Sequence, residues 1–216
     1  MGKLYFLTGD IIENSKNMDA IVNAQNKYML NGSGICGAVY RGAGVELLDY
    51  CKKEYPIPME PCEVRITPGF KLNMDIIHSY APIFREWDNP IEKLLEAYNN
   101  ILVEIKNKEY VKVIIPSLGT GIHGYKHEDV AYQVINLLYE FCNTTNVDIY
   151  FVNLFSMVTD IYLNALNDKN KFNKADLLDM LLNEKECYED FVNGKAPEDM
   201  CYYEKLIYLK VTGEEI

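Results

Sequence analysis

The sequence is poor in histidine and tryptophan, with three His and one Trp in 216 residues, and it has no C-x-x-C pair. The six cysteines are scattered and show no zinc-type spacing with the histidines, so we expect no metal site. No apolar run reaches the length of a membrane span, and the N-terminus "MGKLYFLTGD" turns polar within a few residues. We therefore expect a chain that works in a reducing, cytoplasmic setting, away from membranes.

The chain also lacks an excess of positive charge, since its net charge is −11. This balance argues against general binding to nucleic acid or to anionic membranes. The phosphate-binding motif G-x-x-x-x-G-K-[ST] is missing, and no other cofactor motif is complete. An anionic ligand would therefore be held mainly by backbone N–H groups rather than by a cluster of lysines.

Short β-branched or aromatic segments alternate with amphipathic ones along most of the chain, and 49% of the residues are hydrophobic. This alternation predicts an α/β fold, a three-layer α-β-α sandwich around a mixed, largely parallel sheet. We expect strands at 4–9, 20–24, 63–67, 74–82, 111–116 and 147–155, and helices at 35–53, 89–108 and 127–141.

The last fifty residues differ from the rest. Residues 167–216 carry 7 basic and 12 acidic side chains, a net charge of −5, and no recognisable chemistry. Their leucines and tyrosines favour packing on the main domain, although a partner-binding extension is the alternative. We expect one domain at 1–166 and a mostly helical, acidic extension at 167–216.

Two glycine-rich stretches follow predicted strands, "NGSGICG" at 31–37 and "SLGTGIHGY" at 117–125. In open α/β sheets, ligands bind beyond the carboxyl ends of the strands, where loops lead into helix N-termini. Glycine lets the backbone approach a ligand closely, and the helix dipole favours phosphate. Flexible turns are the alternative interpretation. "GSGICG" has the letters of the dinucleotide motif, but no acidic residue on a following strand completes that site.

The motifs resemble those of the macrodomain family, the ADP-ribose-binding fold, and more narrowly its MacroD-type branch. "TGDI" and "AIVNAQN" are similar to the family's opening and to its A-I-V-N-A-A-N, and "GSGICGAVYRGAG" is similar to G-G-G-V-x-x-A-I-x-x-A-A-G. "IPSLGTGIHGYKHEDVA" resembles the family's second loop, and "VNLFSMVTDIYLNAL" its last strand and helix. The resemblance covers residues 3 to 166.

The resemblance implies a role for several polar and aromatic residues. Asp10 would accept a hydrogen bond from the adenine amino group, with the Ile11 N–H beside it and Phe155 packed on the base. Without the family, Asp10 reads as a helix or turn cap and Phe155 as a core residue. Asn23 and Asn26 would hold the strand end and the distal ribose, the sugar farther from adenine; otherwise both are turn residues.

The glycine loops would cradle the diphosphate of such a ligand. His123 would sit over the distal ribose, or else it is a solvated loop histidine. His78 is expected in the core, His127 on the surface, and Tyr125 beneath the second loop. The implied ligand-binding residues of the two loops are Ser33, Gly34, Ile35, Cys36, Gly37, Ser117, Gly119, Thr120, Gly121, Ile122, His123 and Gly124.

Cys36 departs from the branch. Hydrolytic members carry there an aspartate that helps to place the attacking water, and many have histidine where this chain has Tyr40. Asn26 is kept. A thiol replaces a carboxylate only if it ionises, which a helix N-terminus favours. Two functions follow: an ADP-ribose-binding module for free or protein-attached ligand, or a hydrolase acting on mono-ADP-ribosylated protein or O-acetyl-ADP-ribose. His123 is a weaker acid–base candidate. The oligomeric state is open.

Overall fold

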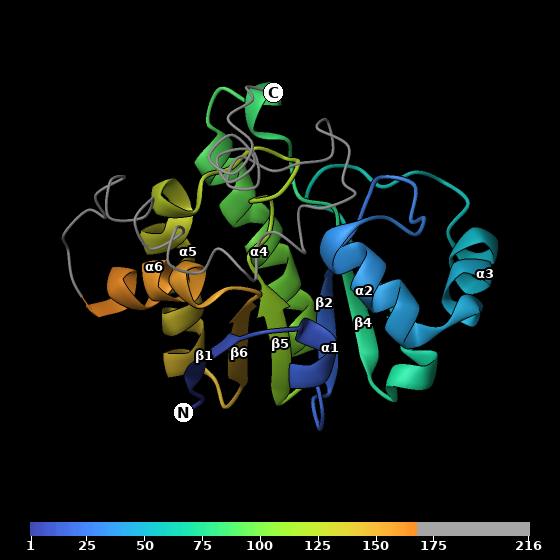
Figure 1. Ribbon diagram of the computed structural model, residues 1–216, viewed down its shortest axis with the longest axis horizontal. Helices are drawn as coiled ribbons and strands as arrows, with labels where there is room; N and C mark the ends of the chain where they lie inside the picture. Colours follow the sequence, from blue (N-terminus) through green and yellow to red (C-terminus); the bar gives the residue numbers. More distant parts are fainter. Residues whose placement is uncertain (168–216) are drawn as a thin grey trace, which may run out of the picture.

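A computed structural model describes residues 1–167 of the chain, and in it six strands form a single sheet (Figure 1). The strand order is β1-β6-β5-β2-β4-β3. All neighbours pair in parallel except β3 and β4, which are antiparallel. The strands are β1 (Leu4–Thr8), β2 (Ala20–Ala24), β3 (Val64–Pro68), β4 (Asp75–Ser79), β5 (Lys112–Pro116) and β6 (Asp148–Asn153).

Helices cover both faces of the sheet, which confirms the predicted three-layer sandwich. One core cluster joins the sheet to α1, α2 and α3, and a second joins it to α4, α5 and α6. In Figure 1, α2 and α3 lie on the right of the strands, and α5 and α6 on the left. The helices are α1 (Ile11–Asn14), α2 (Gly34–Ala43), α3 (Val45–Glu54), α4 (Pro90–Asn107), α5 (His127–Thr144) and α6 (Ser156–Asn167).

The single helix predicted at 35–53 is wrong, because Gly44 divides it into α2 and α3. The backbone of Gly44 has φ +92°, a conformation that side chains rarely adopt, and its N–H donates to the Tyr40 carbonyl to close α2. An added Cβ would lie 2.6 Å from a Glu46 oxygen. Apolar spacing continues across this break, so the periodicity alone did not reveal it.

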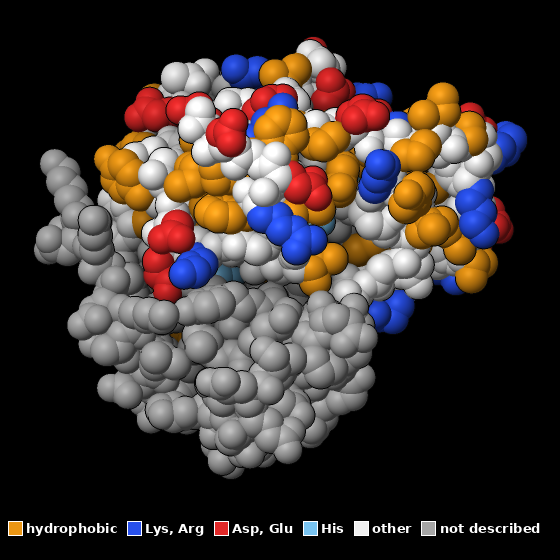
Figure 2. Space-filling model, turned by 90° about the horizontal axis from the view of Figure 1, so that it is seen from above, with side chains coloured by type: hydrophobic (Ala, Val, Ile, Leu, Met, Phe, Trp, Pro, Cys, Tyr) orange, Lys and Arg blue, Asp and Glu red, His pale blue; other side chains and the backbone are white. Residues whose placement is uncertain are grey.

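The parallel strands end at one edge of the sheet, hereafter the carboxyl edge, which faces upward in Figure 1. The loops that lead into α2 and α5 leave the sheet at this edge, as the sequence predicted. In the view from above, the described side chains drawn in colour are a mixture of basic, acidic and apolar types (Figure 2).

The structure bears on two further expectations, the C-terminal extension and the absence of a membrane span. The extension predicted at 167–216 falls outside the described residues, apart from Asn167 at the end of α6. Among the helices of residues 1–167, none is long and apolar enough to cross a membrane.

Candidate functional site

The first glycine loop, residues 31–37, ends in the first turn of α2. Gly34 has φ +54°, and no atom of the described residues lies within 4 Å of the position that a side chain would take there. At Gly37, in contrast, an added Cβ would lie 2.5 Å from the Gly32 carbonyl oxygen. The N–H groups of Gly34, Ile35 and Cys36 precede the first intrahelical hydrogen bond, which Gly37 makes to Ser33. The start of α2 therefore suits an anion.

The second glycine loop, residues 117–125, is built on aromatic packing. Gly119 has φ +73°, and an added Cβ would meet the Tyr125 ring at 2.8 Å. Tyr125 is buried beneath the loop, as expected, and its hydroxyl donates to the Pro90 carbonyl. Thr120 donates to the Ser117 hydroxyl at 3.1 Å. The loop is thus fixed from below.

The tip of the second loop is open. Among residues 1–167, no atom lies within 4 Å of a Cβ built on Gly121, and the φ of Gly121 is not positive. The next residue, Ile122, exposes 65% of its surface. Neither the backbone conformation nor the packing of the described residues requires glycine at 121. A ligand that approaches the backbone closely would require it.

His123 is more enclosed than a solvated loop histidine. Its ring meets the edge of Tyr80 at a centroid distance of 5.7 Å, and its Nδ1 is buried without a hydrogen-bond partner in the described part of the chain. Burial lowers the pKa of His123, so the ring is mostly neutral at pH 7. No hydrogen bond among the described residues links it to Asn26 or Cys36.

Asp10 stands at the end of β1 and caps α1. Its Oδ1 accepts from the Ile12 N–H at 2.7 Å and from the Glu13 N–H at 3.2 Å, so the capping role is present. Oδ2 makes no hydrogen bond within residues 1–167 and remains available to a ligand. Ile11 is buried at the start of the helix. Phe155 follows β6, the strand beside β1, and is half-buried.

The Asn26 side chain organises the backbone of residues 26–30. Its Oδ1 accepts from the N–H groups of Tyr28 and Leu30, and its Nδ2 donates to the Leu30 carbonyl. Nδ2 also lies 3.9 Å from the Cys36 sulfur. Asn26 therefore shapes the loop as a turn residue does, at the position where the resemblance implies contact with the distal ribose.

The Cys36 thiol points into the protein and is only 6% exposed. It donates to Gln25 Oε1 at 3.2 Å and to the Leu30 carbonyl at 3.4 Å. Burial raises the pKa of Cys36 to about 11, which outweighs the effect of the helix N-terminus. A thiol with this pKa is neutral at pH 7, which argues against the thiolate alternative.

Gln25 links Cys36 to Tyr40. The Gln25 Nε2 donates to the Tyr40 hydroxyl at 2.9 Å, and this hydroxyl donates onward to the Met29 carbonyl at 2.6 Å. Gln25 Oε1 also accepts from the Asn26 N–H at 2.7 Å. Three of the residues that depart from the family's pattern thus form one buried hydrogen-bonded group beneath the first loop: Gln25, Cys36 and Tyr40.

His78 and Asn23 extend this group across the sheet. His78 is fully buried, as expected, and its Nδ1 faces the side-chain amides of Asn23 at 3.1 Å and Gln25 at 3.3 Å. Two amide donors at Nδ1 place the proton on Nε2, which then donates to Thr67 Oγ1 at 3.0 Å. Burial lowers the pKa of His78 to about 3. Asn23 is fully enclosed and supports the strand end from inside.

Buried polar atoms without partners gather at the carboxyl edge. They belong to Asn23 (Oδ1) at β2, Ser79 (Oγ) at β4 and Asn153 (both amide atoms) at β6, with His123 (Nδ1) in the second loop. Of the described residues, Gln133 is the other one with such an atom. Because buried polar groups are normally hydrogen-bonded, this edge is built to meet water or a polar ligand.

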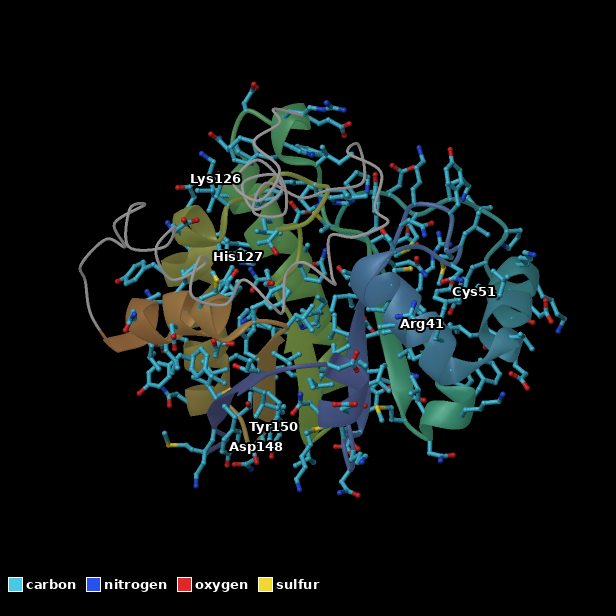
Figure 3. All side chains as sticks on the ribbon, in the orientation of Figure 1. Arg41, Cys51, Lys126, His127, Asp148 and Tyr150 are labelled. Carbon is cyan, nitrogen blue, oxygen red and sulfur yellow. The ribbon has the colours of Figure 1, made fainter. Side chains whose placement is uncertain are left out.

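The expectation that His127 lies on the surface is wrong. His127 is buried, and its Nδ1 lies 2.9 Å from the Tyr162 hydroxyl of α6. Figure 3 places it with Lys126 at the start of α5, at the opposite end of the sheet from Asp148. Burial lowers the pKa of His127 to about 3. It supports the second loop from the helix that follows.

Comparison with known proteins agrees with this geometry. The family model of the Macro domain matches residues 22–134. An O-acetyl-ADP-ribose deacetylase of Salmonella typhimurium is 33% identical over 143 residues, covering 64% of this chain and 79% of that protein. The chain belongs to the Macro domain family.

Other relatives identify the branch of the family to which the chain belongs. The ADP-ribose glycohydrolase MACROD2 of Xenopus laevis is 31% identical over 175 residues, covering 77% of this chain and 40% of that protein, so this is a Macro domain of MacroD type. The structure of an Oceanobacillus iheyensis macrodomain with ADP matches with a TM-score of 0.69 and 32% identity, over 76% of this chain and 90% of that one. A Trypanosoma brucei macrodomain in complex with ADP-ribose shares the fold at 21% identity, a TM-score of 0.66, and 76% and 68% coverage.

Two residues of this Macro domain site were missed by sequence reasoning. Gln25 could have been found, because the family has alanine at that position. Asn153 carried no signal, since an asparagine at a strand end reads as a turn residue. Within residues 1–167, no three His, Cys, Asp or Glu side chains are placed to hold a metal ion. What the arrangement offers chemically is backbone donors, amides and one acceptor carboxylate.

A separate hollow of about 510 Å³ lies beside the edge strand β3 and the ends of α3 and α4. It contains Arg65, whose guanidinium already binds Glu63 at 2.6 Å and the Ile57 carbonyl at 2.7 Å. None of the residues that line this hollow belongs to either glycine loop. We therefore keep the candidate site at the carboxyl edge, where the two loops lie.

Proposed function

We propose that this Macro domain binds ADP-ribose, free or attached to protein, at the carboxyl edge between its two glycine loops. The observation that carries the proposal is Gly121, a glycine that neither its backbone conformation nor its packing within residues 1–167 requires. The unfilled space at Gly34 on the opposite loop supports it. The relatives whose names mention ADP-ribose add to this support.

Titration calorimetry with ADP-ribose tests the proposal. We expect a dissociation constant in the micromolar range, about −8 kcal/mol of binding free energy. ATP and NAD serve as controls. Heat and a thermal shift with ATP or NAD, but none with ADP-ribose, would reject the assignment.

Substitutions of Asp10 test the proposal more sharply, because one carboxylate oxygen caps α1 and the other is available to the ligand. Asp10→Asn keeps the oxygen that caps α1 but replaces the free carboxylate oxygen with an amide donor. It should weaken ADP-ribose binding by about 1–3 kcal/mol at unchanged stability. Asp10→Ala should weaken binding similarly and also lose about 1 kcal/mol of stability from the cap. Unweakened binding by Asp10→Asn would remove Asp10 from the site.

We further propose that the bound ligand is turned over slowly or not at all. The support is the neutral Cys36 thiol, which points at Gln25 where a hydrolytic member has a carboxylate beside the water. A neutral thiol whose single S–H faces two acceptor oxygens is a poor acceptor for a water proton.

Hydrolysis of mono-ADP-ribosylated protein or of O-acetyl-ADP-ribose is the second candidate function. It is favoured by the retained Asn26 and by the deacetylase and glycohydrolase among the relatives. Release of label from an auto-modified protein, with rates compared between wild type and Cys36→Ala, distinguishes it from binding alone. We also propose a cytoplasmic setting, which the four free, buried cysteines of the described chain favour.

A further inference from the structure

Asn153 is the last residue of β6 and lies at the carboxyl edge beside the loop of Asp10. It pairs with Thr8 of β1, and its carbonyl accepts from the Gly9 N–H at 2.9 Å. Gly9 directly precedes Asp10, the residue that the resemblance assigns to the base. β1 and β6 are separated from β2, which leads into the first glycine loop, by β5. Asn153 therefore belongs to the Asp10 side of the edge.

The side-chain amide of Asn153 is buried and has no partner. Only 5% of the residue is exposed, yet neither Nδ2 nor Oδ1 makes a hydrogen bond among the described residues. The other asparagines near the site, Asn14, Asn23 and Asn26, each use at least the amide nitrogen in a hydrogen bond. A buried polar group that is left unpaired destabilises the folded protein. An apolar residue would fill the same space without that cost.

The strand register sets the surroundings of Asn153. Side chains alternate along β6, so Asn153 lies on the same face as Ile149 and Phe151. Val152 pairs with Pro116 of β5, which brings Ser117 beside Asn153. Ser117 accepts from Thr120 and begins the second glycine loop. Asn153 and Ser117 thus form a polar floor between the Asp10 loop and the second loop.

We propose that Asn153 binds the nucleoside half of the ligand, donating from Nδ2 and accepting at Oδ1. This inference rests on the proposed ADP-ribose binding and names a further residue of that site. The edge of adenine and the ribose hydroxyls each offer both donors and acceptors, which match an amide. The phosphates offer acceptors only and would leave Oδ1 unpaired.

Calorimetry of the full chain with ADP-ribose, ADP and AMP tests the proposal in wild type and Asn153→Leu. Leucine has the same branched arrangement of heavy atoms as asparagine, with two methyl groups in place of the amide oxygen and nitrogen, and it has no polar side-chain atom. Affinity should fall roughly tenfold for all three ligands, or about 1.4 kcal/mol, because all three contain the nucleoside. The melting temperature of the ligand-free variant should stay the same or rise, because an unpaired amide has been removed.

Gln133→Leu is the matched control, since Gln133 also has a buried oxygen without a partner but lies within α5. It should leave all three affinities unchanged. Unchanged affinities in Asn153→Leu would overturn the proposal, as would a loss for ADP-ribose that is absent for AMP. A fall in melting temperature together with weaker binding would show a structural role and overturn it equally. If wild type binds no ADP-ribose, the proposed function itself has failed.

Discussion

The two glycine loops occupy equivalent positions but are supported in different ways. Beneath the first loop lies a buried polar group in which Gln25 connects Cys36, Tyr40 and His78. Beneath the second lies aromatic packing around Tyr125. In each loop one glycine is required by close packing, Gly37 or Gly119, and another has open space around it, Gly34 or Gly121. The shared feature is open backbone, and the difference lies in the chemistry beneath it.

This difference separates binding from catalysis. In the proposed site the open glycines of both loops would meet a ligand's phosphates, whereas the position from which a carboxylate would act belongs to the first loop alone. At that position the Cys36 side chain belongs to the buried polar group under the loop. The loop can therefore keep its shape for binding while lacking an acceptor for water.

The largest effect is expected at the open tip of the second loop. Gly121→Glu puts a bulky anion where the backbone would meet the diphosphate, so ADP-ribose affinity should fall by at least about 100-fold, or 2.7 kcal/mol. Circular dichroism and melting temperature should stay as in wild type, because the space is empty. Retained affinity in a folded variant would show that this loop does not line the site.

The two glycines of the second loop should separate stability from binding. Gly119→Ala forces a side chain into positive φ and against the Tyr125 ring, and should lower the free energy of unfolding by about 2 kcal/mol. Gly121→Ala should leave it within about 0.5 kcal/mol of wild type. Denaturant unfolding of both variants measures the contrast. Equal losses would contradict the distinction between packed and open glycines.

The role of the polar group beneath the first loop can be tested by replacing Cys36 and Gln25 with the residues that the family has at these positions. Cys36→Asp alone places a carboxylate opposite two oxygen acceptors, Gln25 Oε1 and the Leu30 carbonyl, and should lower stability without creating activity. Gln25→Ala with Cys36→Asp removes one of these oxygens and leaves space. This double variant should hydrolyse mono-ADP-ribosylated protein at least about tenfold faster than wild type, a change of 1.4 kcal/mol in barrier. Equal rates in all three proteins would refute the role of the polar group.

The smallest effect concerns the buried histidines, one under each loop. His78 and His127 have folded-state pKa values lowered to about 3 by burial, below the ordinary 6.5. The neutral histidines therefore contribute fully to the free energy of unfolding above pH 6.5. This contribution is lost as the pH falls toward 3, because the histidines of the unfolded chain become protonated and those of the folded chain do not. Each should cost about 0.7 kcal/mol of stability between pH 7 and pH 6. Urea unfolding at both pH values measures the sum, and a stability that rises on acidification would contradict it.

The sandwich and the places of the two loops could be predicted from the sequence, because strand and helix periods alternate and glycines follow two strands. The break at Gly44 could not, since helical spacing runs through α2 and α3 and the positive φ appears only in the folded backbone. His127 was misplaced for a similar reason. A first-turn histidine looks exposed until α6 is seen to bring Tyr162 against it.

At the site, the sequence showed which residue types are present but not how their side chains are oriented. Cys36 was recognised as a departure from the family, yet only the structure shows that its thiol donates to Gln25 and is neutral. Asn153 became visible only through its burial without partners. Direction and burial depend on residues distant in the sequence, and no local pattern contains them.

The most direct test of the account measures binding and turnover together on the wild-type chain. Mono-ADP-ribosylated protein is held at saturating enzyme, and bound and released ADP-ribose are followed over time. The account predicts saturable binding with release at least about tenfold slower than that of the Gln25→Ala, Cys36→Asp variant. Rapid release by wild type that persists in Cys36→Ala would contradict it, and would assign catalysis to residues outside the polar group beneath the first loop.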